Sequence, residues 1–415
     1  MHSDRGESME HDPEGRWKQL AVLSVAMVLS MAPWFSTSAV LPQLRESWGL
    51  SRVAGSWLTI AVQIGFVLGA IGMALTNLAD RMSPRRLILV GASLAAVANV
   101  MPAVLDAYGP TLIARLATGA ALAAVYPPAM KAMSTWFRFE RGLALGAMVG
   151  ALTIGSALPH LVNGVGGIGW RTVLIVTSIA TFLGGVVADR LGSDGPFTYP
   201  VAPFEPRAVR EAFANRRVRL ATLGYFGHMW ELYAMWAWFG TFFVDVLVAN
   251  GDGDPVAHAA LVTAAVIGIG ALGSLWAGRV SDRWSREVAA GVPMVVSSLI
   301  AAGIGFLHDS SPVLVAVLGL VWGVSVVADS AQFSTIVTEA ADQRFVGTSL
   351  TVQLASGFVL TVATIFFVPV IHDAWGWGPA FAFLVPGPVL GAWAMRVLDN
   401  ERKVELANSD VVVAR

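Results

Sequence analysis

The chain has 415 residues, of which 55% are hydrophobic and only 13% are charged, whereas soluble domains carry about 25% charged residues. An ordinary soluble protein is therefore excluded. The formal net charge of -1 argues against a nucleic-acid partner, and the absence of cysteine excludes disulfides, thiolate metal sites and thiol catalysis.

Apolar runs recur from Leu20 to Leu398, and many reach the roughly 20 residues that a helix needs to cross a bilayer. They predict an all-α polytopic membrane protein with twelve transmembrane helices. The first run is too long for the core of a signal peptide, so we expect it to be retained. The spans are expected near residues 19–41, 54–78, 87–105, 110–131, 141–163, 169–189, 218–245, 257–280, 288–307, 312–336, 345–371 and 378–398.

Polar breaks divide the chain into two six-helix bundles, at 19–189 and 218–398, with a tail at 1–18, a linker at 190–217 and a second tail at 399–415. The segment "EPRAVREAFANRR" of the linker predicts a short amphipathic helix at the membrane surface. In this arrangement 23 of the 27 Lys and Arg residues lie on the side of both termini. Because positive residues concentrate in cytoplasmic loops, both termini and the linker are predicted to be cytoplasmic.

Two loops repeat one pattern in the two halves. "LADRMSPRR" follows the second predicted span and "GRVSDRWSRE" follows the eighth, and Asp80 and Asp282 lie 202 residues apart. An arginine with a spaced glycine, Arg115 and Gly119, stands in span four. With the six-plus-six layout, these motifs resemble the major facilitator superfamily of secondary transporters over essentially the whole chain.

The resemblance implies two pseudo-symmetric six-helix bundles that rock about a central site, in the inner membrane of a bacterial or archaeal cell. Its expected partners are a small-molecule substrate, protons and the lipid bilayer, with no cofactor or metal and with a monomer as the working unit. The chain contains no phosphate-binding loop for ATP. A multidrug or metabolite exporter, a membrane-embedded enzyme and a transport-inactive sensor remain as alternatives, although no H-E-x-x-H or G-x-S-x-G motif occurs.

The repeated loops are predicted to form a cytoplasmic gate, in which an aspartate pairs with arginines or with a helix N-terminus. Alternatively, these arginines only anchor the topology. The residues of this gate are Asp80, Arg81, Arg85, Arg86, Asp282, Arg283 and Arg286.

Three ionisable residues inside the spans are predicted to couple proton movement to transport. His228 and Glu231 share one helix face, and Glu231 is expected about 20 Å along its span, near the bilayer centre. Acids inside a membrane are usually functional, although a His–Glu hydrogen bond that fixes helix packing would explain the same pair. Asp329 in span ten is a second coupling candidate, against a gate or a snorkelled charge.

Arg115 stays charged even when buried, so it is expected either to bind an anionic solute or to serve as a structural cation inside the first half. Other polar and aromatic residues at probable mid-depth positions are expected to line the substrate cavity. Together with Arg115 they are Trp34, Gln63, Tyr126, His160, Trp230, Tyr233 and Gln353.

Overall fold

The computed structural model describes residues 12–166, 168–197, 209–342, 344 and 346–413, and every regular element within them is a helix. Eleven helical stretches of these residues are long and apolar enough to cross a membrane. The first predicted span supplies the twelfth, although its unbroken part has only 16 residues. The twelve-helix membrane fold is therefore confirmed.

The described part of the first half contains ten helices, because two of its six spans are interrupted and two short helices lie between spans. They are α1 (Arg16–Met31), α2 (Ser36–Ala39), α3 (Leu41–Trp48), α4 (Arg52–Thr76), α5 (Leu78–Arg81), α6 (Pro84–Leu105), α7 (Tyr108–Leu122), α8 (Tyr126–Ser134), α9 (Arg141–Gly164) and α10 (Trp170–Leu191).

The second half follows the same plan. Its elements are α11 (Val209–Ala212), α12 (Arg216–Ala249), α13 (Pro255–Gly268), α14 (Gly270–Arg283), α15 (Arg286–Ile304), the 3₁₀ turn η2 (Gly305–Leu307), α16 (Pro312–Ala328), α17 (Ser330–Ala340), α18 (Val346–Trp375), α19 (Trp377–Ala382) and α20 (Pro386–Val413).

The predicted first span is not one continuous helix. It breaks after Met31, because Pro33 has no N–H to donate to the helix and its ring clashes with the carbonyl one turn earlier. The chain turns through residues 32–35 before α2 begins. Proline also lies at the start of α8 and of α20, where the fourth and twelfth spans are interrupted. These breaks leave backbone carbonyls inside the membrane that need partners.

Glycines bring α4 and α7 into backbone contact within the first half. A Cβ atom on Gly65 would lie 2.0 Å from the carbonyl oxygen of Leu116, and one on Gly119 would lie 2.0 Å from that of Val62. Because no larger residue fits at either position, the two helices are locked at the closest separation that a backbone allows.

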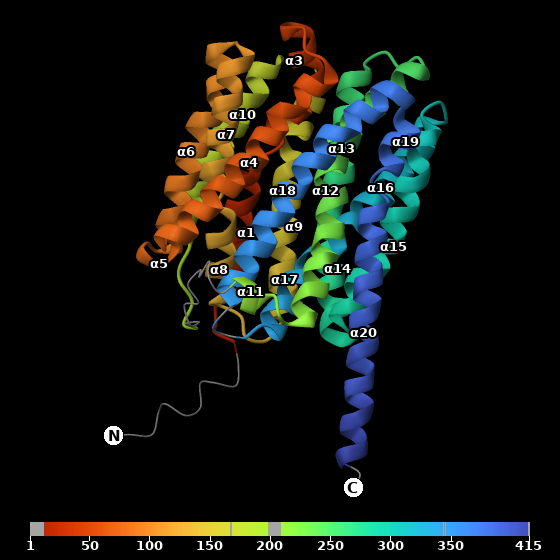
Figure 1. Cartoon of the computed structure of the whole chain (residues 1–415). Coiled ribbons are helices and arrows are strands. Elements are labelled where there is room, and N and C mark those ends of the chain that lie inside the picture. The colour runs from red at the N-terminus through yellow and green to blue at the C-terminus, as the bar shows by residue number, and fades with distance from the viewer. Residues whose placement is uncertain (1–11, 167, 198–208, 343, 345, 414–415) are drawn as a thin grey trace.

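The two halves meet along α4 and α18, and along α9 with α13 and α14 (Figure 1). Both termini lie at the same end of the bundle, and α20 projects beyond it there (Figure 1). We call this end the termini end and the other the far end. Arg216 and Arg217 at the start of α12 pair with Glu401 and Glu405 of the projecting helix.

The linker differs from its prediction as far as it is described. The described part of the segment expected to form one amphipathic helix, residues 209–217, is divided between two helices. Val209–Ala212 form α11, and Arg216 and Arg217 begin α12. Residues 205–208 of that segment lie outside the described residues. The segment after residue 398 continues as part of α20 up to Val413.

Candidate functional site

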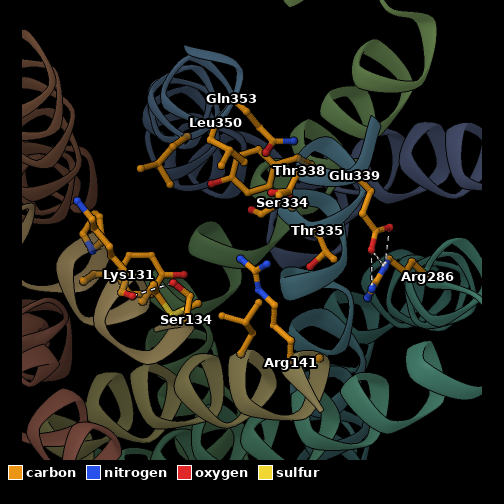
Figure 2. Close-up of a pocket in the computed structure, with 17 residues that line it drawn as sticks. Lys131, Ser134, Arg141, Arg286, Ser334, Thr335, Thr338, Glu339, Leu350 and Gln353 are labelled. Carbon is orange, nitrogen blue, oxygen red and sulfur yellow. Dashed lines mark hydrogen bonds and ion pairs between the residues drawn. The ribbon is translucent and has the colours of Figure 1, made fainter. Parts of the chain in front are cut away.

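A cavity of about 390 Å³ lies between the two halves at the termini end. One wall comes from α8 and α9 of the first half, and the other from α12, α15, α17 and α18 of the second (Figure 2). Both walls carry polar side chains near the termini end. These are Lys131, Ser134 and Arg141 in the first half, and Ser334, Thr335, Thr338 and Glu339 in the second. Tyr126, Tyr225 and Gln353 lie deeper along the spans.

Two basic side chains have different surroundings in this cavity. Arg286 forms a two-pronged ion pair with Glu339, with its Nη2 2.7 Å from Oε1 and its Nε 2.9 Å from Oε2. Arg141 projects from α9 toward Thr335 on the opposite wall (Figure 2). Gln353 is 1% exposed, and its Nε2 has no hydrogen-bond partner among the described residues. The cavity therefore offers a solute both charged and neutral hydrogen-bonding groups.

Ion pairs close the far end between the same two halves. Arg52 at the start of α4 lies 3.3 Å from Asp245 of α12 and 3.4 Å from Asp373 of α18. The indole of Trp377 also donates to Asp245, at 2.9 Å. These contacts connect three elements across the interface, so the far end cannot open unless they separate.

An aromatic layer fills the space between the cavity and the far end. Trp34 packs against Phe66 at 4.9 Å and against Tyr233 at 5.8 Å between ring centroids, so it joins the two halves. Phe66 and Phe358 are 4.5 Å apart. The full layer consists of Trp34, Phe35, Phe66, Tyr233, Trp236 and Phe358. Its rings are buried and block the path from the cavity to the far end.

Arg115 lies inside the first half, away from the cavity. Its guanidinium is fully buried and does not line the cavity. All its partners come from the first half, and three of them are backbone carbonyls. Nε donates to the carbonyl of Leu58 at 3.2 Å, and Nη2 donates to the carbonyl of Trp34 at 2.7 Å. Nη1 donates to the carbonyl of Pro33 at 2.9 Å, to Ser36 Oγ at 3.1 Å and to Asn99 Oδ1 at 2.8 Å.

These contacts explain why a permanent charge can stay in the membrane interior. The carbonyls of Pro33 and Trp34 are exposed by the break after α1, where the helix dipole places partial negative charge. Arg115 satisfies them, and they solvate Arg115. Asn99 completes the arrangement, because its Nδ2 donates to the hydroxyls of Thr177 and Ser178 on α10.

Glu231 lies inside the second half, where it accepts two hydrogen bonds. The Nε1 of Trp322 donates to Oε1 at 2.6 Å, and the Oγ of Ser297 donates to Oε2 at 2.8 Å. The carboxyl group is 1% exposed, and no Lys, Arg or His forms an ion pair with it among the described residues. The predicted alternative, a hydrogen bond to His228, is absent from the described part of the chain, because each residue has other partners.

His228 pairs with Asp329 instead. Their Nδ1 and Oδ1 atoms are 2.8 Å apart, and both side chains are 3% exposed. Asp329 caps the end of α16 at the break before α17, so the prediction of a snorkelled charge is wrong. On the other side of the imidazole, Nε2 lies 2.9 Å from the hydroxyl of Ser330. Ser330 is partly exposed and stands one turn from Ser334, which lines the cavity.

The remaining predicted cavity residues fall into four groups. Tyr126 and Gln353 line the cavity, and Trp34 and Tyr233 belong to the aromatic layer. Gln63 and His160 are buried toward the far end, at 0% and 3% exposure. Trp230 does not line the cavity in this conformation, since its ring packs on Phe383 and its Nε1 donates to the carbonyl of that residue.

The predicted gate at the termini end is described only in part. The side chains of Asp80 and Asp282 lie outside the described residues. Arg85 donates to the carbonyl of Gly192 and approaches Asp194 at 4.0 Å, while Arg286 holds Glu339. Arg81, Arg86 and Arg283 have exposed side chains.

Several residues of these clusters were not predicted, and four of them show why. Asn99 could have been found, because an amide in an apolar span usually forms hydrogen bonds between helices. Asp245 stands near the end of an apolar span and carried a similar signal. Trp322 and Ser297 gave none, because nothing in their sequence neighbourhood shows that they face Glu231.

Comparison with known proteins gives a consistent result. The family model of the Major Facilitator Superfamily matches residues 23–364. The multidrug efflux pump LfrA of Mycolicibacterium smegmatis is 26% identical over 212 residues, which are 50% of this chain and 42% of the pump. The match thus spans less than half of that relative.

Two other relatives carry names of transported compounds. A gallate transporter of Pseudomonas putida is 22% identical over 66% of this chain and 68% of its own length. The hexuronate transporter of Escherichia coli K12 is 27% identical over 40% of this chain and 39% of its own length.

A solved structure has the same fold. It is a bacterial homologue of the human lysosomal transporter Spinster in an inward-facing, unoccupied conformation. The TM-score is 0.67 at 16% sequence identity, over 93% of this chain and 98% of the other.

Proposed function

Since the chain belongs to the Major Facilitator Superfamily of membrane transporters, we propose that it moves a small organic solute by alternating access, driven by a proton gradient. The termini end faces the cytoplasm in this proposal, because most of the Lys and Arg residues lie there. The location is the inner membrane and the working unit is a monomer.

The observation that carries the proposal is the difference between the two ends of the interface. A cavity of about 390 Å³ separates the halves at the termini end, while Arg52, Asp245 and Asp373 join them at the far end. A transporter whose halves rock about a central site needs one open and one closed end in each state. The present arrangement supports the state that is open to the cytoplasm.

The His228–Asp329 pair is proposed to load the proton from the cavity. Its route begins at Ser334 on the cavity wall and continues to the partly exposed hydroxyl of Ser330, which contacts the imidazole Nε2. The imidazole Nδ1 then faces Asp329 at 2.8 Å. A histidine with one nitrogen toward a hydroxyl and the other toward a carboxylate is arranged to relay a proton.

Glu231 is proposed as a second proton site, deeper in the bundle. It stands three residues after His228 on α12, about 4.5 Å further along the helix axis. An ionised carboxylate without a counter-charge is costly in a dry interior. Glu231 would therefore take up and release its proton as solvent access changes during the transport cycle.

The test is proton movement in proteoliposomes that contain a pH-sensitive dye. Gallate, glucuronate and tetraphenylphosphonium are added in turn, to cover an aromatic acid, a sugar acid and a lipophilic cation. We expect one of them to drive proton flux in the wild type, and Glu231→Gln and Asp329→Asn to lose at least ten-fold of that flux while they still bind the solute. Asp106→Asn is the control, because Asp106 pairs with Arg171 at the far end of the first half, outside both the cavity and the proposed relay.

Solute uptake without proton movement would rule out the coupling. Unchanged flux in both acid variants would reduce Glu231 and Asp329 to packing roles. If the wild type moves none of the three probes, the proposed solute classes are wrong.

Export is the second candidate, and the similarity to a multidrug efflux pump favours it. The same experiment separates the two directions. When a solute gradient drives symport, protons follow the solute into the vesicles and the dye reports acidification. When it drives antiport, as an exporter requires, protons leave and the dye reports alkalinisation.

A further inference from the structure

A second, much smaller cavity of about 10 Å³ lies at the closed end of the interface. The first half contributes Ser38, Pro42 and His160 to its wall, and the second half contributes Gly240, Thr241 and Val244 from α12. Thr241 is one helical turn from Asp245, which pairs with Arg52. The cavity therefore lies directly behind the ion pairs that close the far end.

Buried polar groups without partners surround this cavity and the adjoining aromatic layer. Thr37 Oγ1, His160 Nε2 and both polar atoms of the Gln63 side chain have no hydrogen-bond partner among the described residues. The indole nitrogens of Trp34 and Trp236 are also unpaired there. All five side chains are at most 3% exposed.

Their neighbours place them together where the halves meet. Trp34 and Trp236 belong to the aromatic layer, and Thr37 follows Trp34 by three residues, in the short helix α2. Gln63 stands one turn before Phe66, the residue on which Trp34 packs. His160 lines the small cavity opposite Gly240.

Unpaired buried donors and acceptors reduce stability, and native proteins keep few of them without a reason. Elsewhere in the first half, Asn99 and Thr181 have partners, while Ser30 and Thr111 are buried without one among the described residues, so the groups at this interface form the larger cluster of unpaired atoms. A set of unpaired groups at a closed interface would gain partners if that interface opened to water or solute.

We propose that the small cavity is the collapsed outer vestibule of the transporter, and that Thr37, Gln63 and His160 hydrogen-bond uncharged polar groups of the solute once the far end opens. The proposal rests on the alternating access proposed above. The chemical class follows from the polar groups of this region. The cavity wall itself offers the imidazole of His160 and the hydroxyls of Ser38 and Thr241. The unpaired hydroxyl of Thr37, the amide of Gln63 and two indole N–H groups belong to the buried layer beside it. Arg115, the nearby permanent charge, is fully engaged by its five acceptors.

Opening requires the walls to separate, and small residues allow them to close this tightly. Gly240 faces the imidazole, and a Cβ at that position would make an ordinary van der Waals contact with His160 Cε1 at 3.7 Å. Ala39, Ala259 and Ala260 form other parts of the wall. When α12 and α13 move away from α2 and α9, the site exposed is polar at its base and apolar at its sides.

Single cysteines test the vestibule without background, because the natural chain contains no cysteine. Thr37→Cys reports the proposed vestibule and Ser334→Cys reports the open cavity. Thr181→Cys is the matched control, a fully buried threonine of α10 that bonds within its own helix. Each variant is placed in sealed vesicles of known orientation and treated from either side with a membrane-impermeant methanethiosulfonate, and modification is measured by mass.

We expect Ser334→Cys to react from the termini side and Thr37→Cys to react from the far side. Adding Arg52→Gln should accelerate modification of Thr37→Cys at least ten-fold and leave Thr181→Cys unmodified. Thr241→Cys, on the opposite wall, repeats the test if Thr37→Cys does not fold. If the cysteine on either wall stays as unreactive as Thr181→Cys in both backgrounds, or reacts only from the termini side, the vestibule is overturned.

The solute class is tested by protection of the same cysteine. Glucuronate or gallate, which carry hydroxyl groups, should slow modification of Thr37→Cys, and tetraphenylphosphonium should not. Protection by the cation alone, or by neither hydroxylated probe, overturns the hydrogen-bonding assignment. Modification of the cysteine from the far side does not depend on proton flux. The vestibule can therefore be confirmed or overturned even if the proposed proton coupling is wrong.

Discussion

The two halves bury charge in opposite ways. In the first half, Arg115 has five acceptors, and the residues around it are held by further hydrogen bonds. In the second half, Glu231 has two neutral donors, and Asp329 faces a histidine. A guanidinium surrounded by fixed hydrogen-bond acceptors keeps its charge. An acid without a permanent counter-charge can lose its charge by taking up a proton.

We infer from this difference that the buried charges of the two halves have different roles. In the first half the buried charge lies against a broken helix, because Arg115 donates to the carbonyls of Pro33 and Trp34 beside the break. In the transport cycle that we propose, the groups that take up and release the proton, Glu231 and the His228–Asp329 pair, belong to the second half.

The strongest test of the comparison is removal of the permanent charge. Arg115→Met removes five buried hydrogen bonds, among them those to the carbonyls of Leu58 and Trp34, so we expect a loss of about 3–5 kcal/mol in the free energy of unfolding. Arg115→Lys should restore only part of it, because one ammonium group cannot reach acceptors that are spread over three elements. Thermal unfolding in detergent, followed by size-exclusion chromatography, measures both.

Arg171 provides the control for Arg115. It forms an ion pair with Asp106 at the far end, but its side chain is half exposed. Arg171→Ala should therefore cost only about 0–1 kcal/mol. If the two arginine variants were equally stable, the structural role of Arg115 would be refuted.

A smaller effect should distinguish two buried tryptophans of the second half. Trp322 donates to Glu231, and Trp238 donates to the backbone carbonyl of Ile365. Each Trp→Phe change leaves a buried acceptor without its donor and should cost about 1–3 kcal/mol. Only Trp322→Phe should shift the pH dependence of proton flux to higher pH, because a carboxylate that loses a hydrogen bond holds its proton more tightly.

The measurement is proton flux in proteoliposomes as a function of pH, next to thermal unfolding of the same samples. Equal pH profiles for the two variants would show that Glu231 does not titrate during transport. A shift in both would mean that general loosening of the bundle, and not the hydrogen bond to Glu231, controls the profile.

The smallest expected change in stability comes from the charges between the halves. The side chains of Arg52, Asp245 and Asp373 are 25%, 35% and 44% exposed, so Arg52→Gln should cost only about 0.2–1 kcal/mol. The cost should also fall at high salt, because exposed charges are screened. Thermal unfolding at low and high ionic strength measures it. A cost as large as that of Arg115→Met would place the ion pairs among the buried structural charges.

The sequence predicts the spans well because bilayer thickness sets their length and composition. It misplaces the interior of the first span, where α1 ends after Met31, because hydropathy does not register a break that tertiary contacts stabilise. Pro33 marked that break, but nothing in the local sequence shows that a span-four arginine satisfies the freed carbonyls.

The candidate proton sites were partly predictable for a similar reason. The spacing of His228 and Glu231 places them on one helix face, as expected. Their partners, however, come from α15, α16 and the break before α17, and spacing along one helix contains no information on which helices pack beside it. Thus the residues were predictable, and their pairing was not.

The break in the first span also has a consequence for synthesis in the cell. The carbonyl of Pro33 lies 82 residues before the arginine that satisfies it. At about 5–20 residues per second, the ribosome needs roughly 4 to 16 s to make that stretch. During this interval the first span must wait in the membrane or in its insertion machinery with an incomplete core, and it acquires its final shape only when the fourth span arrives beside it.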